Sequence, residues 1–149
     1  MTFKLKILQQ YQLLVNDKID IFQDMILDLT QDSLNDVKGS AGDKHETALS
    51  MMHIEQEKLN HKLSEYHLQK NILEKIDATQ THTKITLGSL VQTNGMLLFM
   101  STALPKIVVD GKTIIAVSAQ SPLGQKLIGN TKGFEFELNN SKFTIENVN

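Results

Sequence analysis

Two carboxylates near the middle of the chain, Asp43 and Glu46, have the residue types and the spacing best suited to chemistry. They stand three positions apart at the expected start of a helix, where such side chains share one face. A pair of this kind can hold a divalent cation and orient a water molecule. The same Asp-x-x-Glu pattern also forms a capping box, in which Asp43 accepts a hydrogen bond from the Glu46 amide. The spacing leaves both roles open, and one pair can serve both.

The remaining polar residues form no further catalytic motif. His53 and His61 are eight positions apart, which is two helical turns, and His45-Glu46 lacks the second histidine that a zinc-binding helix places four residues on. We therefore expect the histidines to be solvated on helix faces. The sequence has no cysteine, and no glycine-rich phosphate loop or Ser-His-Asp grouping is evident. An enzyme that works alone is not expected.

Length and composition set the outer bounds. With 149 residues and 40% apolar content, the chain can bury a core as one domain or as two very small ones. The absence of cysteine suits a reducing cytoplasm. The first residues do not form a signal-peptide pattern, and no stretch approaches the roughly 20 apolar residues of a membrane span. We expect a soluble, cytoplasmic protein without membrane contact.

Charge is distributed unevenly. Residues 1–77 hold nine lysines against thirteen acidic residues, whereas residues 78–149 hold six lysines against four. Every basic residue is lysine, so the bidentate arginine contacts used in base recognition are unavailable. Sequence-specific DNA binding is therefore not expected.

Two heptad patterns predict a helical hairpin over residues 1–77. The first helix should run from about residue 4 to 37, which contains neither Gly nor Pro, and the second should follow the break at Gly39-Ser40-Ala41-Gly42. Arms of about 30 residues would make a rod of roughly 45 Å. We expect an antiparallel coiled coil whose second seam is diluted by Gln56 and Lys70. The seam positions are Leu8, Tyr11, Val15, Ile19, Phe22, Met25, Ile26 and Leu29 in the first helix, and Leu49, Met52, Leu59, Leu63, Tyr66 and Leu73 in the second.

Residues 78–149 have the pattern of a small β-rich domain. The polar segment 77–83 marks the boundary, and Asn94-Gly95 and Asp110-Gly111 predict type I′ hairpin turns. The first hairpin should pair residues 85–91 with 96–100, the second 107–109 with 114–117, and the third 134–138 with 143–145. One short helix should begin with Ser121 as N-cap and end before Gly129. The fold class is therefore α+β, with a mainly antiparallel sheet carrying one helix.

The segment from Ser121 to Gly133 resembles the signature of the C-terminal domain of Gre-type transcription elongation factors. It contains Ser121-Pro122-Leu123-Gly124, a short helix ending in Leu127-Ile128-Gly129, and Gly133 opening a strand. Residues 85–89 and 143–148 are similar to the first and last strands of that domain. The resemblance implies an FKBP-like fold that docks on RNA polymerase through residues Ser121, Pro122, Leu123 and Gly124.

The expected bend resembles the tip of the same family. Gly42-Asp43-Lys44-His45-Glu46-Thr47-Ala48 reproduces its Gly-Asp-x-x-Glu-x-Ala pattern. In such factors the hairpin enters the secondary channel of RNA polymerase, and the tip carboxylates help the polymerase retain a second Mg²⁺ for transcript cleavage. The resemblance implies this role for Asp43 and Glu46, with Mg²⁺ shared with the polymerase, no cofactor bound by the chain alone, and indirect contact with nascent RNA. His45 could reach an RNA phosphate or tune the carboxylates.

The sequence departs from the family just beyond this tip. Cleavage factors typically continue Ala-Glu-Tyr, whereas this chain has Ala48-Leu49-Ser50, and Lys44 stands where an apolar residue is usual. A regulator of the same fold that binds polymerase without stimulating cleavage is therefore one alternative. A coiled-coil scaffold for a partner helix is another, and an FKBP-like peptidyl-prolyl isomerase is a third. The isomerase lacks support because residues 78–149 offer only four Phe and no Trp or Tyr for an aromatic pocket.

Overall fold

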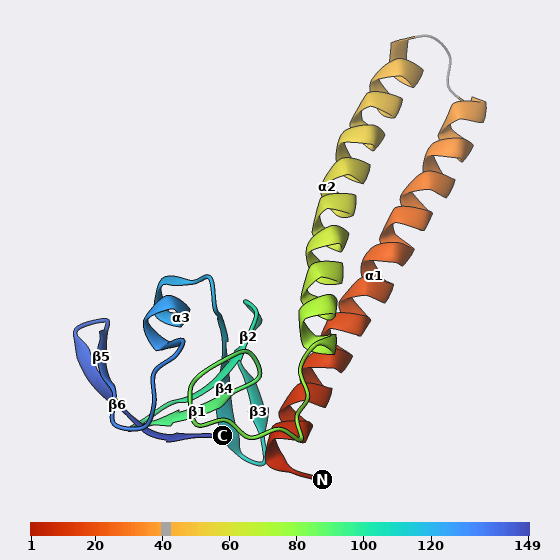
Figure 1. Cartoon of the computed structure of the whole chain (residues 1–149). Helices are drawn as coiled ribbons and strands as arrows, with labels where there is room; N and C mark the ends of the chain where they lie inside the picture. Colours follow the sequence, from red (N-terminus) through yellow and green to blue (C-terminus); the bar gives the residue numbers. More distant parts are fainter. Residues whose placement is uncertain (40–42) are drawn as a thin grey trace. The chain divides into compact units, whose positions relative to one another are not determined.

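A computed structural model describes the backbone of residues 1–39 and 43–149 and the side chains of residues 1–32 and 47–149. It confirms the predicted α+β class: the long helices α1 (Phe3–Gly39) and α2 (Asp43–Glu74) precede a six-stranded sheet with one short helix, α3 (Pro122–Leu127) (Figure 1). The described helices contain no stretch that is long and apolar enough to cross a membrane.

The chain forms two compact units. The hairpin unit is Leu13–Lys70, and the sheet unit joins Met1–Gln12 to Asn71–Asn149. Residues 1–12 are thus the first turns of α1 and at the same time part of the sheet unit. The predicted domain boundary between residues 77 and 78 stays a prediction.

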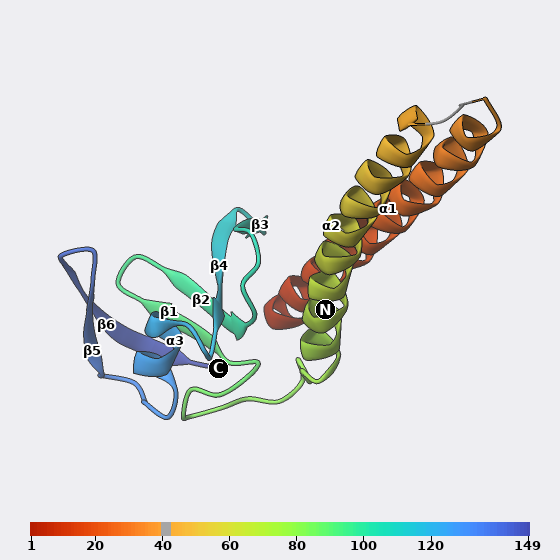
Figure 2. The same ribbon diagram turned by 90° about the horizontal axis from the view of Figure 1, so that it is seen from above.

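The hairpin unit consists of the remainder of α1 lying beside most of α2 (Figure 2). Val15, Ile19 and Leu59 are buried as the heptads predicted. Farther along, Phe22 and Tyr66 meet with ring centroids 5.3 Å apart at an interplanar angle of 52°. These apolar contacts stabilise the pair, since helices of this kind gain most of their stability from packing one face.

Polar residues enter the seam nearer the bend. Gln56 is half-buried and donates from Nε2 to Thr30 Oγ1 at 2.8 Å, which agrees with the expected dilution of the second seam. Met25 was predicted to lie in the seam, and this prediction is wrong, because its side chain is 43% exposed. It precedes the half-buried Ile26, and one residue turns the helix by about 100°, so Met25 lies outside the seam that buries Ile26.

The sheet has the strand order β3-β4-β2-β1-β6-β5. Its strands are β1 (Leu90–Thr93), β2 (Leu97–Ser101), β3 (Ile107–Val109), β4 (Lys112–Ser118), β5 (Glu135–Leu138) and β6 (Ser141–Val148). The pairing is mainly antiparallel, as predicted, and β2 and β4 form the parallel pair. The connection between these two strands contains β3, which pairs with β4 at the edge. The FKBP-like assignment stays a prediction.

The turns show which local signals were sufficient. Asp110 and Gly111 have φ values of 51° and 76°, as the predicted type I′ turn requires. The same prediction is wrong for Asn94-Gly95, because Asn94 does not adopt a positive φ. Its side-chain Oδ1 instead accepts a hydrogen bond from the backbone N–H of Thr144 on β6 at 2.7 Å.

The first strand begins later than predicted, at Leu90 rather than at residue 85. The chain turns at Thr86–Ser89, where Gly88 has a φ of 88°. Ser89 closes the turn twice, since its N–H donates to Thr86 O and its Oγ accepts from Thr86 N, both at 3.0 Å. A strand cannot pass through that geometry.

The sheet has a core on each face. Alternate residues place Val91, Leu98, Met100 and Val117 on one side, where they pack with Leu127 of α3. Phe99 and Ile114 belong to the opposite side and are fully buried. There the Tyr11 ring lies parallel to that of Phe99, with centroids 6.2 Å apart and an interplanar angle of 6°. The first turns of α1 therefore complete the second core.

Candidate functional site

The predicted tip lies largely outside the described residues. Asp43 is the first residue of α2, but the side chains of Asp43, Lys44, His45 and Glu46 are outside the described part, as is the whole of Gly42. Ala48 is exposed on α2. Among the side chains that are described, His, Asp and Glu do not gather in the groups of three that could hold a metal ion. The metal and capping roles of Asp43 and Glu46 both stay predictions.

The predicted docking segment is a capped helix start. Ser121 has extended backbone, with φ −69° and ψ 159°, and its Oγ accepts from Gly124 N at 3.0 Å. The same hydroxyl donates to Ser118 O at 2.7 Å. Pro122 follows at the first helical position, where its missing N–H is not needed. The hydroxyl therefore donates one hydrogen bond and accepts another within its own segment, so Ser121 acts as a structural cap.

Gly124 fixes how closely α3 approaches the end of β4. A Cβ at this position would lie 1.9 Å from Ser118 O and 2.9 Å from Ala119 Cα, both of which are backbone atoms. Only a residue without a side chain fits there. The sequence did not reveal this reason for glycine, because the contact depends on how the chain folds back after β4.

The surface of this segment is formed by exposed and half-buried residues of one helical turn. Pro122, Gln125 and Lys126 are exposed, whereas Leu123 is half-buried and packs against the core. The N–H of Gln125 donates to Ser121 O at 2.9 Å, which holds the first turn. Such a surface can offer a partner the apolar ring of Pro122, the amide of Gln125 and the positive charge of Lys126. It has no group placed for covalent chemistry.

The first turns of α1 supply a second set of polar contacts in the sheet unit, which sequence reasoning missed. Lys4 is almost completely buried, with only 3% of its surface accessible to solvent. Its Nζ donates to Gln80 O at 2.8 Å and to Asn149 O at 3.1 Å. Burial lowers the pKa of Lys4 below its ordinary value, and the charge of Asp77 partly opposes that effect. The ammonium thus ties the start of α1 to the segment after α2 and to the end of β6.

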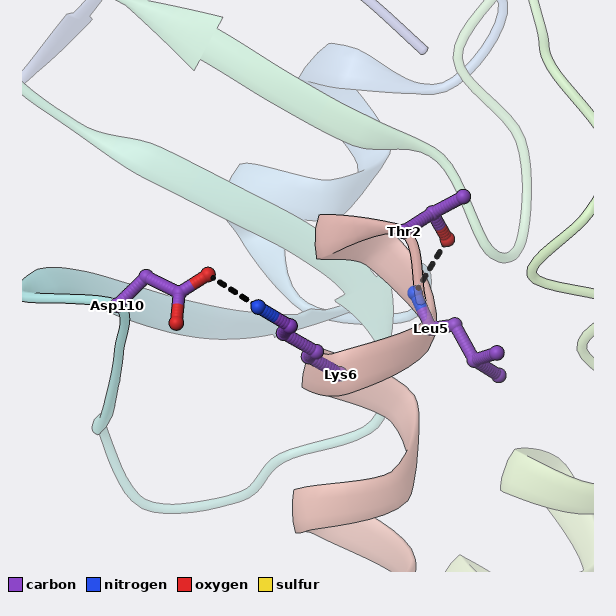
Figure 3. A network of polar contacts seen from close by, with 4 residues as sticks. All are labelled: Thr2, Leu5, Lys6 and Asp110. Atoms are coloured by element: carbon purple, nitrogen blue, oxygen red, sulfur yellow. Dashed lines mark hydrogen bonds and ion pairs between the residues drawn. The ribbon is translucent and has the colours of Figure 1, made fainter.

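Three further contacts hold the same turns. Tyr11 Oη donates to Pro105 O at 2.9 Å, and burial raises the pKa of Tyr11 to about 12. Lys6 Nζ lies 2.9 Å from Asp110 Oδ2 in the turn between β3 and β4 (Figure 3). Thr2 Oγ1 accepts from Leu5 N at 3.2 Å, as an N-cap does. Thr2 ahead of an apolar period was a readable helix start, but nothing local indicated the partners of Lys4 or Tyr11.

Comparison with known proteins adds little to this geometry. No family model matches the chain, and no curated protein matches it in sequence. Among solved structures, the transcription factor Gfh1 is similar, with 15% identity, coverage of 92% of each chain and a TM-score of 0.36. A score at that level carries no argument about fold or function.

Proposed function

We propose that this chain is a transcription factor of the Gre type, which binds RNA polymerase and inserts its helical hairpin through the secondary channel toward the active site. The sheet unit would dock on the polymerase through Ser121, Pro122, Leu123 and Gly124. The bend at Asp43 and Glu46 would reach the site of RNA synthesis. The chain itself would be an accessory factor in the cytoplasm and not an enzyme.

One coincidence carries the proposal. A helical hairpin with Gly-Asp-x-x-Glu-x-Ala at its bend stands ahead of a sheet whose short helix is capped by Ser121 and Pro122. The two motifs lie about 75 residues apart in the sequence and belong to different units, so a single local cause cannot account for both. Within the hairpin unit, α1 contributes residues 13–39 and α2 residues 43–70, and 27 or 28 residues at 1.5 Å per residue give a length of about 40 Å.

Within this proposal, Asp43 and Glu46 would share a second Mg²⁺ with aspartates of the polymerase. Two metal ions stabilise the attacking and leaving oxygens in phosphoryl transfer, which is why two added carboxylates could matter at that place. The chain alone would hold no cofactor. Contact with nascent RNA would be indirect, although His45 at the tip could reach an RNA phosphate.

The sequence after the tip favours regulation over cleavage. Ala48-Leu49-Ser50 replaces the family's Ala-Glu-Tyr, so the proposed main effect is competition with a cleavage factor or altered initiation. The isomerase alternative gains no support from the sheet unit. Phe99 and Phe136 are buried in its cores, and a shallow depression of about 340 Å³ beside β1, β2 and β4 has no aromatic lining.

Binding to core RNA polymerase is the decisive test. Fluorescently labelled full-length protein should bind saturably at moderate salt, and Pro122→Ser should weaken that binding more than Lys106→Ser, an exposed site of the sheet unit outside the segment from Ser121 to Gly133. Absence of saturable binding would remove the proposal altogether. The alternative function, a coiled-coil scaffold for a partner helix, would then remain, and binding of that helix would depend on seam residues such as Phe22 and Leu59.

A second assay separates cleavage from regulation. Backtracked complexes should show little added RNA cleavage with the wild-type protein, because the tip lacks the Glu-Tyr pair. If the tip does hold Mg²⁺, Asp43→Asn and Glu46→Gln should abolish whatever cleavage exists and leave binding intact. The matched control is Glu55→Gln, an exposed carboxylate on α2 away from the bend. Strong Mg²⁺-dependent cleavage by the wild type would contradict the regulatory form of the proposal.

A further inference from the structure

One outward side of α1 in the hairpin unit combines exposed apolar residues with aspartates. The apolar members are Leu13, Ile21 and Met25, with exposed fractions of 62%, 49% and 43%. The acidic members are the exposed residues Asp20, Asp24 and Asp28. Residues three or four apart are neighbours on a helix, so Ile21 adjoins Asp24, and Met25 adjoins both Ile21 and Asp28. We name these six residues the acidic-apolar face.

The charges on this face are not compensated within the described part of the chain. None of the three aspartates makes an ion pair there. Residues 13–32 hold a single lysine, Lys18, against five aspartates. Asp20, Asp24 and Asp28 follow one another at intervals of four, and like charges at that spacing repel and destabilise a helix. A cation beside them would relieve this repulsion.

The apolar members need a different partner from the charges. Large apolar side chains that lie exposed together on a helix commonly mark a surface for another protein. Burial of Ile21 and Met25 requires apolar side chains opposite, which metal ions and nucleic acid phosphates do not supply. Nucleic acid is further disfavoured because its phosphates would meet the aspartates at close range. An occupant that satisfies both demands is cationic and amphipathic.

We propose that the acidic-apolar face binds a lysine- or arginine-rich amphipathic segment of another protein. The occupant's apolar side chains cover Ile21 and Met25, and its cations lie against Asp20, Asp24 and Asp28. Helical segments recognised in this way present their anchors three and four residues apart, the spacing found on α1. The proposal concerns α1 alone and does not depend on polymerase binding.

The test uses full-length protein and a defined probe. The probe is a labelled 20-residue helical peptide of Leu and Lys in a heptad pattern, and its partner probe replaces every Lys with Glu. Fluorescence anisotropy measures the Kd. The charge variant Asp24→Asn/Asp28→Asn is matched by Glu55→Gln/Glu57→Gln, which removes two exposed charges from α2. The apolar variant Ile21→Gln/Met25→Gln is matched by Met51→Gln/Ile54→Gln, also exposed on α2.

The expected result is saturable binding of the Lys peptide and none of the Glu peptide. Each variant on α1 should raise the Kd at least tenfold, whereas each α2 control should stay within twofold. Circular dichroism of all four variants verifies that the helices remain. Equal losses from the charge variants on α1 and α2 would overturn the proposal, because binding would then follow net charge alone. It also falls if the wild type does not bind the Lys peptide, or if the apolar variant binds as the wild type does.

Discussion

Replacing Gly124 with alanine should measurably destabilise the sheet unit. The new Cβ would lie 1.9 Å from Ser118 O, 2.8 Å from Ser118 C and 2.9 Å from Ala119 Cα. Ordinary contacts begin near 3.4 Å, so the backbone itself must move by more than 1 Å. Side-chain rotation cannot relieve the clash, because all three atoms belong to the main chain.

The clash has a second consequence through Ser121. The displaced Ser118 carbonyl accepts from Ser121 Oγ at 2.7 Å and from Ser121 N at 3.1 Å. Overpacking costs about 1–3 kcal/mol, and loss of an N-cap adds about 0.5–2 kcal/mol. Alanine's better helix propensity returns up to about 1 kcal/mol, which leaves a net loss of roughly 0.5–5 kcal/mol.

The loss can be measured by urea unfolding with thermal melting as a second probe. In a domain of this size, 1 kcal/mol corresponds to about 4–8 °C in Tm. Lys126→Ala on the same helix is the control, because Lys126 is exposed and its replacement should change stability by no more than about 0.5 kcal/mol. An unchanged unfolding midpoint for Gly124→Ala would refute the argument, since it would mean that the turn after β4 yields freely.

Three other perturbations test the remaining contacts. Ser121→Ala should cost about 0.5–2 kcal/mol in urea unfolding, because the Gly124 N–H loses its acceptor. Tyr11→Phe should cost about 0.5–1.5 kcal/mol at neutral pH through the lost bond to Pro105 O. Because the folded pKa of Tyr11 is raised to about 12, its contribution is complete below the unfolded pKa of about 10 and disappears as pH rises through 12. The wild type should therefore lose more stability than Tyr11→Phe across that window in pH-dependent melts. Finally, a fragment of residues 78–149 should bind a hydrophobic dye and unfold without a cooperative transition, since removal of α1 uncovers the second core. A cooperative transition would show that this core is complete without α1.

The sequence correctly predicted those elements that depend on only a few neighbouring residues. α3 begins at Pro122 because the residue directly before it, Ser121, caps the helix. The turn at Asp110-Gly111 needs only two residues that accept positive φ, and the sequence supplies them. Each of these features is determined by a few neighbouring positions, so a single sequence was sufficient to place it.

The failure at Asn94-Gly95 has a distant cause. The pair has the composition of a type I′ turn, but Asn94 Oδ1 accepts from Thr144 N, fifty positions later. That bond joins the β1–β2 turn to β6, the strand beside β1 in the sheet. This contact between segments far apart in sequence accompanies the departure from a type I′ turn, and no local pattern could show it.

The apolar period of α1 shows a deeper limit of sequence reasoning. One uninterrupted heptad pattern of apolar residues includes Tyr11, Val15 and Phe22, and it predicted one helix packed against one other helix. The helix is correct, but Tyr11 stacks on Phe99 of β2 whereas Phe22 meets Tyr66 of α2. Periodicity reports that a face is buried and not what buries it, because any apolar surface satisfies the same transfer free energy. The change of partner between the sheet unit and the hairpin unit occurs without a break in the pattern, so it became visible only in the structure.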